Sequence, residues 1–222
     1  MNRYYFDLHT HSTDASDDAG ATVEGYLKWI VGRRKKGYRV DGLVLTEHRS
    51  FDFEVDYTAL AEEYGVVVLK GAELETEIGH VLVYGITAAF AREFDLSRVD
   101  LPSKDVFAAA RELGGFAVGA HAGRPRIGIW DHAERGASLD HVTSIEQLNG
   151  GSSHDENARA LVLAERHGLR TIGGSDAHYV SAVGRCLTAF ERPITCIEDL
   201  VEQLRGGDYA PVRIEDTFLG IE

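Results

Sequence analysis

The chain has 222 residues, 44% hydrophobic and 27% charged, a length and composition that suit one globular α/β domain. Its 36 acidic and 23 basic residues give a net charge of −13, which argues against binding duplex DNA through its phosphates. The sequence contains neither an apolar run of about 18 residues nor a signal-peptide pattern, so we expect a cytoplasmic protein without a membrane partner.

Short apolar runs alternate with amphipathic segments along the chain, which is typical of a sheet covered by helices. The apolar runs predict strands over residues 4–9, 40–47, 66–73, 79–86, 115–121, 142–148 and 170–176. Segments with helical spacing and a glycine near their end predict helices over 22–36, 57–65, 103–114 and 155–168. After Pro193 we expect one more helix and a short strand.

Residue types that bind metals stand at the C-terminal ends of several runs, namely His9, Glu47, His48, Glu73, His121 and Asp176. In a parallel barrel these ends converge on one face, so residues far apart in sequence become neighbours. The run 79–86 follows the preceding strand too closely for a crossover helix and is expected to pair antiparallel. The prediction is therefore an α/β fold, a distorted TIM-like (β/α)7 barrel, as a single domain over residues 1–222.

Histidine nitrogens and carboxylate oxygens together suit zinc, manganese or iron better than calcium or magnesium. In the stretch DLHTHSTDASDD, His9 and His11 are two residues apart on a strand and so point to the same side. An HxH pair is weak evidence alone, but His80 and His178 extend the set of strand-end ligands. We read the histidines outside this pattern as structural, keeping only His154 as a weak candidate: His132, His141, His154 and His167.

The motifs DLHTHSTDASD, LTEH, GAE, GHVLVYG, GAHAGRP and GGSDAH follow one another over residues 7–178. In this order they resemble the PHP (polymerase and histidinol phosphatase) domain family, whose members are metal-dependent phosphoesterases with a distorted barrel and two or three metal ions. The resemblance implies a first ion held by His9, His11, Glu73 and Asp176. It implies a second held by Glu73, His80 and His121, and a third held by Asp17, His48 and His178. Asp17 is preferred to Asp14 and Asp18, although the family often reads SDG where this chain reads SDDA.

Further residues gain expected roles from the same motifs. Glu47 replaces the aspartate of the usual TDH, and we expect it either to orient a ligand from behind or to hold a backbone amide. Asp7 is a candidate partner of the ligands. Arg124 stands where related members place an arginine on the substrate phosphate, which suits a planar guanidinium. Arg126 and Arg185 are weaker candidates, whose ordinary role would be a surface or structural ion pair.

The resemblance implies hydrolysis of a small phosphomonoester or phosphodiester, such as a nucleotide or short oligonucleotide, by attack of metal-bound hydroxide. Glu73, Arg124 and His178 would be the catalytic residues, and no covalent phosphoenzyme is expected. One alternative is an amidohydrolase-like metal hydrolase, although no lysine stands at a strand end to bridge two metals. The other is a PHP-type binding module with a vestigial site, against which the complete ligand set counts.

Overall fold

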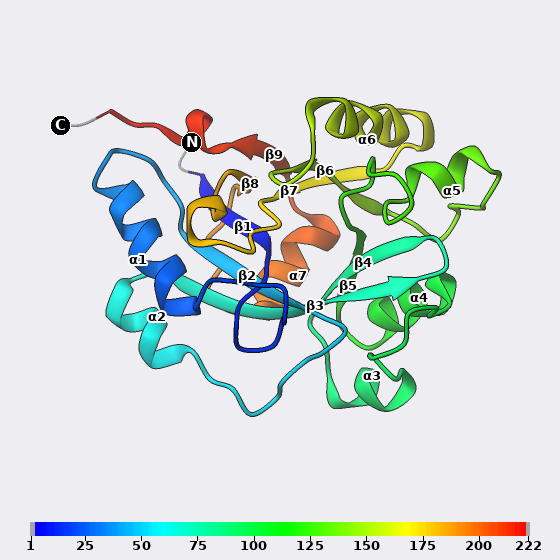
Figure 1. The fold of residues 1–222 in the computed structure, drawn as a ribbon, viewed down its shortest axis with the longest axis horizontal. Helices are drawn as coiled ribbons and strands as arrows, with labels where there is room; N and C mark the ends of the chain where they lie inside the picture. The colour runs from blue at the N-terminus through cyan, green and yellow to red at the C-terminus, as the bar shows by residue number, and fades with distance from the viewer. Residues whose placement is uncertain (1–2, 221–222) are drawn as a thin grey trace.

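The chain folds around one curved sheet in the computed structural model, which describes residues 3–220 (Figure 1). The sheet has nine strands, in the spatial order β7-β6-β5-β4-β3-β2-β1-β8-β9. Their bounds are β1 (Tyr4–Thr10), β2 (Gly42–His48), β3 (Val67–Thr76), β4 (Gly79–Tyr84), β5 (Phe116–Gly119), β6 (Ser144–Asn149), β7 (Arg170–Gly174), β8 (Cys186–Phe190) and β9 (Tyr209–Arg213).

The sheet nearly closes into a barrel because its edge strand β7 returns to β1. The amide of Asp176 donates to the carbonyl of His9 at 2.8 Å, and that of His11 to the carbonyl of Ala177 at 2.9 Å. The strands β1, β2 and β3 are mutually parallel, as are β5, β6 and β7, whereas β4 is antiparallel to both neighbours. The prediction of a distorted TIM-like barrel with an antiparallel excursion is confirmed.

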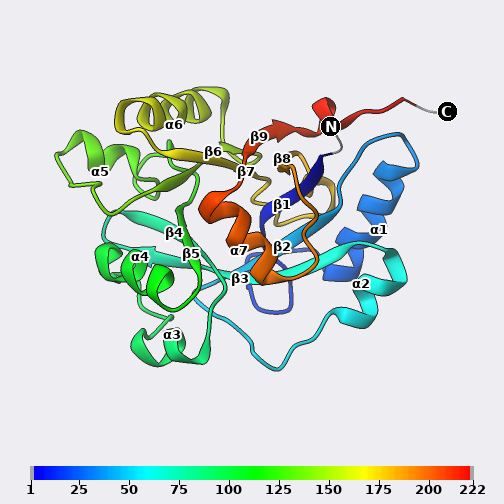
Figure 2. The ribbon, with the colours of Figure 1, turned by 180° about the vertical axis from the view of Figure 1, so that it is seen from behind.

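Helices cover the outside of the sheet (Figures 1 and 2). They are α1 (Val23–Arg34), α2 (Thr58–Tyr64), α3 (Ala88–Glu93), α4 (Ser103–Glu112), α5 (Trp130–Glu134), α6 (His154–His167) and α7 (Ile197–Gly206). Two short 3-10 helices, η1 (Val180–Ala182) and η2 (Ile214–Thr217), follow β7 and β9. Helices α1 and α2 lie on one flank and α3, α4 and α5 on the other, while Figure 2 shows α7 crossing the barrel from behind. Within the described chain, no helix combines the length and apolarity that a bilayer crossing requires.

Local sequence signals explain where the helices begin and end. The hydroxyl of Ser153 accepts from the amide of Glu156, whose carboxylate accepts in return from the amide of Ser153, so that a capping box starts α6. Gly168 ends the same helix with a φ of 65°. In α1, the buried Tyr26 hydroxyl donates to the carbonyls of His11 and Ala177. This helix therefore holds the seam between β1 and β7, next to the predicted metal ligands.

The predicted elements agree with the structure except in three places. Strand β8 and the short helices α3 and α5 were not expected from the sequence. All five residues of β8 are buried, so the strand lacks the alternation of apolar and polar residues that marks a strand with one exposed face. Helices α3 and α5 have six and five residues, too few for a helical period to show. Both cysteines are free, as expected: Cys186 is buried in β8 and Cys196 caps α7.

Candidate metal centre

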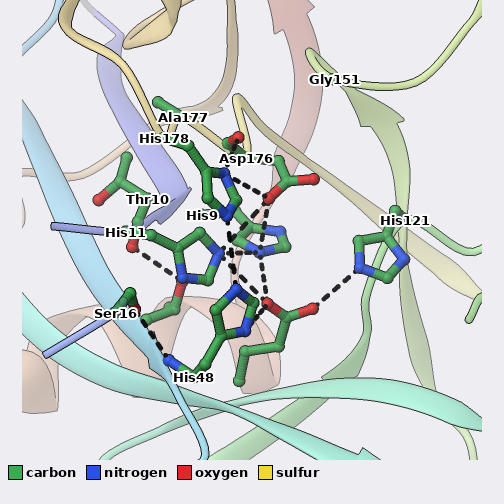
Figure 3. A network of polar contacts seen from close by, with 12 residues as sticks. His9, Thr10, His11, Ser16, His48, His121, Gly151, Asp176, Ala177 and His178 are labelled. Carbon is green, nitrogen blue, oxygen red and sulfur yellow. Dashed lines mark hydrogen bonds and ion pairs between the residues drawn. The ribbon is translucent and has the colours of Figure 1, made fainter. Parts of the chain in front are cut away.

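The predicted ligands meet at one end of the barrel, although they come from almost every part of the chain (Figure 3). Strand β1 delivers His9 and then His11, β2 ends on His48, and Glu73 lies inside β3. His80 comes from β4, His121 follows β5, and Asp176 and His178 follow β7. In Figure 3 the rings of His9, His11, His48 and His178 crowd together, with His121 to one side.

The first group of ligand atoms has the spacing of a tetrahedral metal site. The Nε2 atoms of His9 and His11 lie 3.0 Å apart, and Oε2 of Glu73 lies 3.3 and 3.2 Å from them. Oδ1 of Asp176 is 3.4 Å from both nitrogens. Four ligands around an ion at about 2.0 Å would be about 3.3 Å from one another. The donor set thus fits a divalent ion in both chemistry and spacing.

Glu73 joins the first group to a second one. Its Oε1 lies 2.9 Å from Nδ1 of His80 and 2.9 Å from Nε2 of His121. Burial alone would raise the pKa of the Glu73 carboxyl, but the charge of His9 and hydrogen bonds from the surrounding histidines hold that pKa well below its ordinary value. A buried carboxylate that stays ionised between two ligand groups is the arrangement that a bridge between two cations requires.

The third group differs from the prediction in its carboxylate. Nε2 of His48 and Nε2 of His178 lie 3.4 Å apart, and Oδ2 of Asp18 is 3.3 Å from each. Asp17 is exposed and makes no ion pair with either histidine within residues 3–220, so the choice of Asp17 over Asp18 is corrected. The physical reason is the turn Ser12–Gly20, which folds back on itself and brings the second of two adjacent aspartates over the rings.

Adjacent aspartates offer a matched pair of variants for this third position. We expect Asp18→Asn to weaken the binding of the most loosely held ion by about 10-fold or more, because a charged ligand is lost, and Asp17→Asn to leave it unchanged. Metal titration followed by isothermal calorimetry measures both. The opposite ranking of the two variants would restore Asp17 as the ligand.

Two ligands sit on strained backbone. His121 and Asp176 have φ values of 29° and 53°, a region that residues other than glycine rarely adopt. The turn at Asp176 swings its carboxylate back over β1, and the backbone of Gly174 allows close approach there. A Cβ on Gly174 would lie 2.6 Å from both Oε1 of Glu146 and Cβ of His9. Strain at ligand positions is characteristic of functional sites, where the surrounding structure holds it in place.

Glu146 belongs to this centre and was not predicted. Its carboxylate oxygens lie 3.2 and 3.1 Å from Nδ1 of His9, and one of them accepts from the amide of His121 at 2.7 Å. Glu146 is fully buried on β6. A carboxylate behind a histidine orients the ring and strengthens it as a ligand. The available signal was a glutamate in the middle of the apolar run VTSIEQL, where only a paired charge is tolerated.

Asp7 and Glu47 hold loops rather than ligand rings. The buried carboxylate of Asp7 accepts from the amides of Ser175 and Gly184, and burial raises its pKa to about 6. It thereby anchors the turn that carries Asp176. Glu47 accepts from the amide and hydroxyl of Ser12 and from the hydroxyl of Ser16, which in turn accepts from the amide of His48. Of the two roles expected for Glu47, the structure shows the backbone-holding one.

Arg124 lies at the rim of the centre, with its side chain 19% exposed. Its Nη2 is 2.8 Å from Oδ2 of Asp176 and donates to Oδ1 of Asn149 at 2.9 Å, and its Nε donates to Ser152. Arg126 and Arg185 make no side-chain ion pair within the described chain. The four histidines read as structural are apart from the ligand groups: His132 contacts the carbonyl of Arg126, His141 contacts Ser103, and His154 and His167 are the terminal residues of α6.

Sequence comparison places the chain among known proteins. The PHP-associated family model (PHP_C) matches residues 154–209. Ribonuclease P protein component 3 of Natronomonas pharaonis is 26% identical over 161 residues, which cover 72% of this chain and 58% of that protein. The chain thus spans just over half the length of this curated relative.

Solved structures share the fold. PsfC from Pseudomonas syringae superposes with a TM-score of 0.69 at 23% identity, over 98% of this chain and 94% of that one. Endonuclease Q, in complex with a 27-mer duplex bearing an abasic lesion, gives 0.62 at 18% identity over 96% and 58%. An amidohydrolase from Chromobacterium violaceum gives 0.57 at 20% over 94% and 97%. Together with the family match, these likenesses confirm the resemblance of the chain to the PHP domain family.

Proposed function

We propose that the protein is a metal-dependent phosphoesterase. The observation that carries the proposal is Glu73, a buried carboxylate whose two oxygens contact His9, His11 and His48 on one side and His80 and His121 on the other. Histidine and carboxylate ligands at this spacing suit zinc, manganese or iron in two or three positions. The resemblance to the PHP family supports phosphate esters as the substrate class.

The ligands would be divided among the positions as the three groups indicate. His9, His11, Glu73 and Asp176 would hold one ion, Glu73, His80 and His121 a second, and Asp18, His48 and His178 a third. When bound, such ions supply Lewis acidity toward the phosphate oxygens and lower the pKa of coordinated water. The protein itself contributes the fixed positions of the ligands and a buried, largely water-free floor.

Charge explains why cations are needed for a phosphate to enter. Glu73, Asp176, Glu146 and Asp18 all face the centre, and their combined charge would repel an anionic substrate. Arg124 is the cation at the rim, since its Nη1 makes no hydrogen bond within residues 3–220 while Nη2 and Nε fix the plane of the guanidinium. A phosphate oxygen would be received by this planar group and held against the ligand cluster.

The proposal is tested with a panel of phosphomonoesters and phosphodiesters, each assayed with zinc, manganese and iron. Hydrolysis of at least one ester is expected, together with complete loss of turnover after chelation and recovery on adding metal. Because ligand binding stabilises a folded protein by mass action, chelation should also lower the melting temperature. Unchanged turnover after full metal removal would contradict the proposal.

An amidohydrolase-like reaction is disfavoured by the lysines. Lys70 lies in β3, but its Nζ donates to the carbonyls of Asp52 and Val55 on the outside of the barrel. No lysine of the described chain contacts the ligand groups, so nothing there can form a carbamylated bridge. Amides and lactones in the same substrate panel separate the two chemistries. The expectation that duplex DNA is not a partner has lost its support, since a protein of this fold binds a duplex.

A further inference from the structure

A cavity of about 310 Å³ lies beside the metal centre, outside the ligand groups. Helix α1, the segment that leads into β8, the end of β9 and the loop after β6 enclose it. The residues that matter for its chemistry are Trp29, Arg33, Gly150, Arg185, Arg213 and Glu215. Three guanidinium groups therefore face one carboxylate, in a chain whose net charge is −13.

The three arginines are not used by the fold in the way that other arginines are. Within residues 3–220, the side chains of Arg33, Arg185 and Arg213 make no ion pair, even with Glu215 in the same wall. Nε of Arg33 is buried without a hydrogen-bond partner in that part of the chain, and its guanidinium lies 4.5 Å over the ring of Tyr38. Donors in this state are available to an anion that enters the cavity.

One turn of backbone separates the cavity from the metal centre. A Cβ on Gly150 would lie 3.2 Å from Cβ of Arg185 and 3.0 Å from Cα of Ser175. A Cβ on the next residue, Gly151, would lie 2.5 Å from Nη2 of Arg124 and 3.3 Å from Oδ2 of Asp176. Figure 3 shows Gly151 on the loop beside Asp176. The glycine pair keeps this wall thin, so a substrate can contact both sides of it.

Aromatic side chains line the same path. Tyr179 directly follows His178 and is 64% exposed, with its ring against Gly20. Two residues later, Ser181 lines the cavity, as does Trp29, which is 36% exposed. Exposed aromatic rings between basic groups are the means by which proteins bind single-stranded nucleic acid, because bases stack on the rings while phosphates meet the cations.

We propose that the arginine cavity binds a second phosphate of the substrate, and that the substrate is a short single-stranded oligonucleotide. This rests on the proposed phosphoesterase function, in which the first phosphate occupies the metal centre beside Arg124. The flanking internucleotide phosphate then reaches Arg185 and Arg213, with Arg33 behind them, and the adjoining bases lie against Tyr179 and Trp29.

The test uses the full chain with Arg185→Gln, Arg213→Gln and the double variant, and Arg192→Gln as control. Arg192 is equally exposed but is paired with Glu202 away from the cavity. Binding of a fluorescent pentanucleotide is measured by anisotropy in chelator, over a range of salt concentrations. We expect each cavity variant to weaken binding about 10-fold and to lower the salt slope by about 0.7, the value for one phosphate contact on a single strand. The control should match the wild type.

A second arm measures kcat/KM with manganese on the pentanucleotide and on an aryl phosphate, which has only one phosphate. The cavity variants should lose about 10-fold on the first substrate and nothing on the second. Equal binding by variant and wild type, or equal losses on both substrates, would overturn the cavity proposal. Oligonucleotide binding as expected with no ester hydrolysed by the wild type would contradict the proposed function instead.

Discussion

Replacing Glu73 with glutamine is expected to reduce phosphoesterase activity by about 1,000-fold or more, the order of loss seen when a group that stabilises transition-state charge is removed. The change keeps the shape of the side chain but removes its charge. It also places an amide N–H₂ among nitrogen atoms of five histidines, where only an acceptor fits. Because both oxygens serve separate ligand groups, the bound metal should fall by more than one ion per chain, measured by elemental analysis.

The matched control is Glu75→Gln, on the same strand two residues further along. Glu75 is paired with Arg49 at 3.4 Å near the surface, and an exposed pair of this kind contributes little. Metal content and activity should both stay at wild-type levels in the control. A Glu73→Gln protein that retained its full complement of metal would show that this carboxylate does not bridge the two groups.

Replacing Glu146 with glutamine is expected to lower metal affinity by about 10- to 100-fold without removing any ligand. The carboxylate of Glu146 contacts Nδ1 of His9 and accepts from the amide of His121 and from Nδ2 of Asn149. Asn149 in turn accepts from Arg124, so the effect should reach the rim of the centre. A glutamine satisfies some of these donors but no longer draws the His9 ring toward it.

Metal titration of the Glu146→Gln protein distinguishes positioning from a merely structural role. Excess metal should restore most of the activity, and Glu146→Asp should recover part of the affinity because the charge is kept. Circular dichroism in the unloaded state checks that the barrel still folds. Wild-type metal affinity in Glu146→Gln would mean that the contact with His9 has no part in metal binding.

The sequence predicted most of the ligand set because histidine and carboxylate side chains recur at strand ends. Parallel strands send their C-terminal ends to one face, so the position along each strand was enough to bring His9, Glu73 and His121 together. The antiparallel pairing of residues 79–84 followed from the short turn before them. These features depend on local pattern and on one rule of barrel topology.

Three features could not be predicted, and each depends on packing between segments distant in sequence. Asp17 and Asp18 are adjacent, and the path of the turn Ser12–Gly20 decides which of them reaches His48. Glu146 contacts His9 across 137 positions, which required the exact closeness of β6 and β1 around Gly174. Arg33, Arg185 and Arg213 are unremarkable in the sequence and become a cavity only when α1, β8 and β9 meet.

The sequence by itself determined the chemistry of the protein, since the residue types at the strand ends select divalent metals and the motifs indicate the PHP family. The tertiary structure decided which carboxylates serve that chemistry and what lies beside it. The reason is physical: a strand-end pattern states that a side chain arrives at the barrel mouth, whereas contacts of about 3 Å depend on loop paths and on the closing of the sheet.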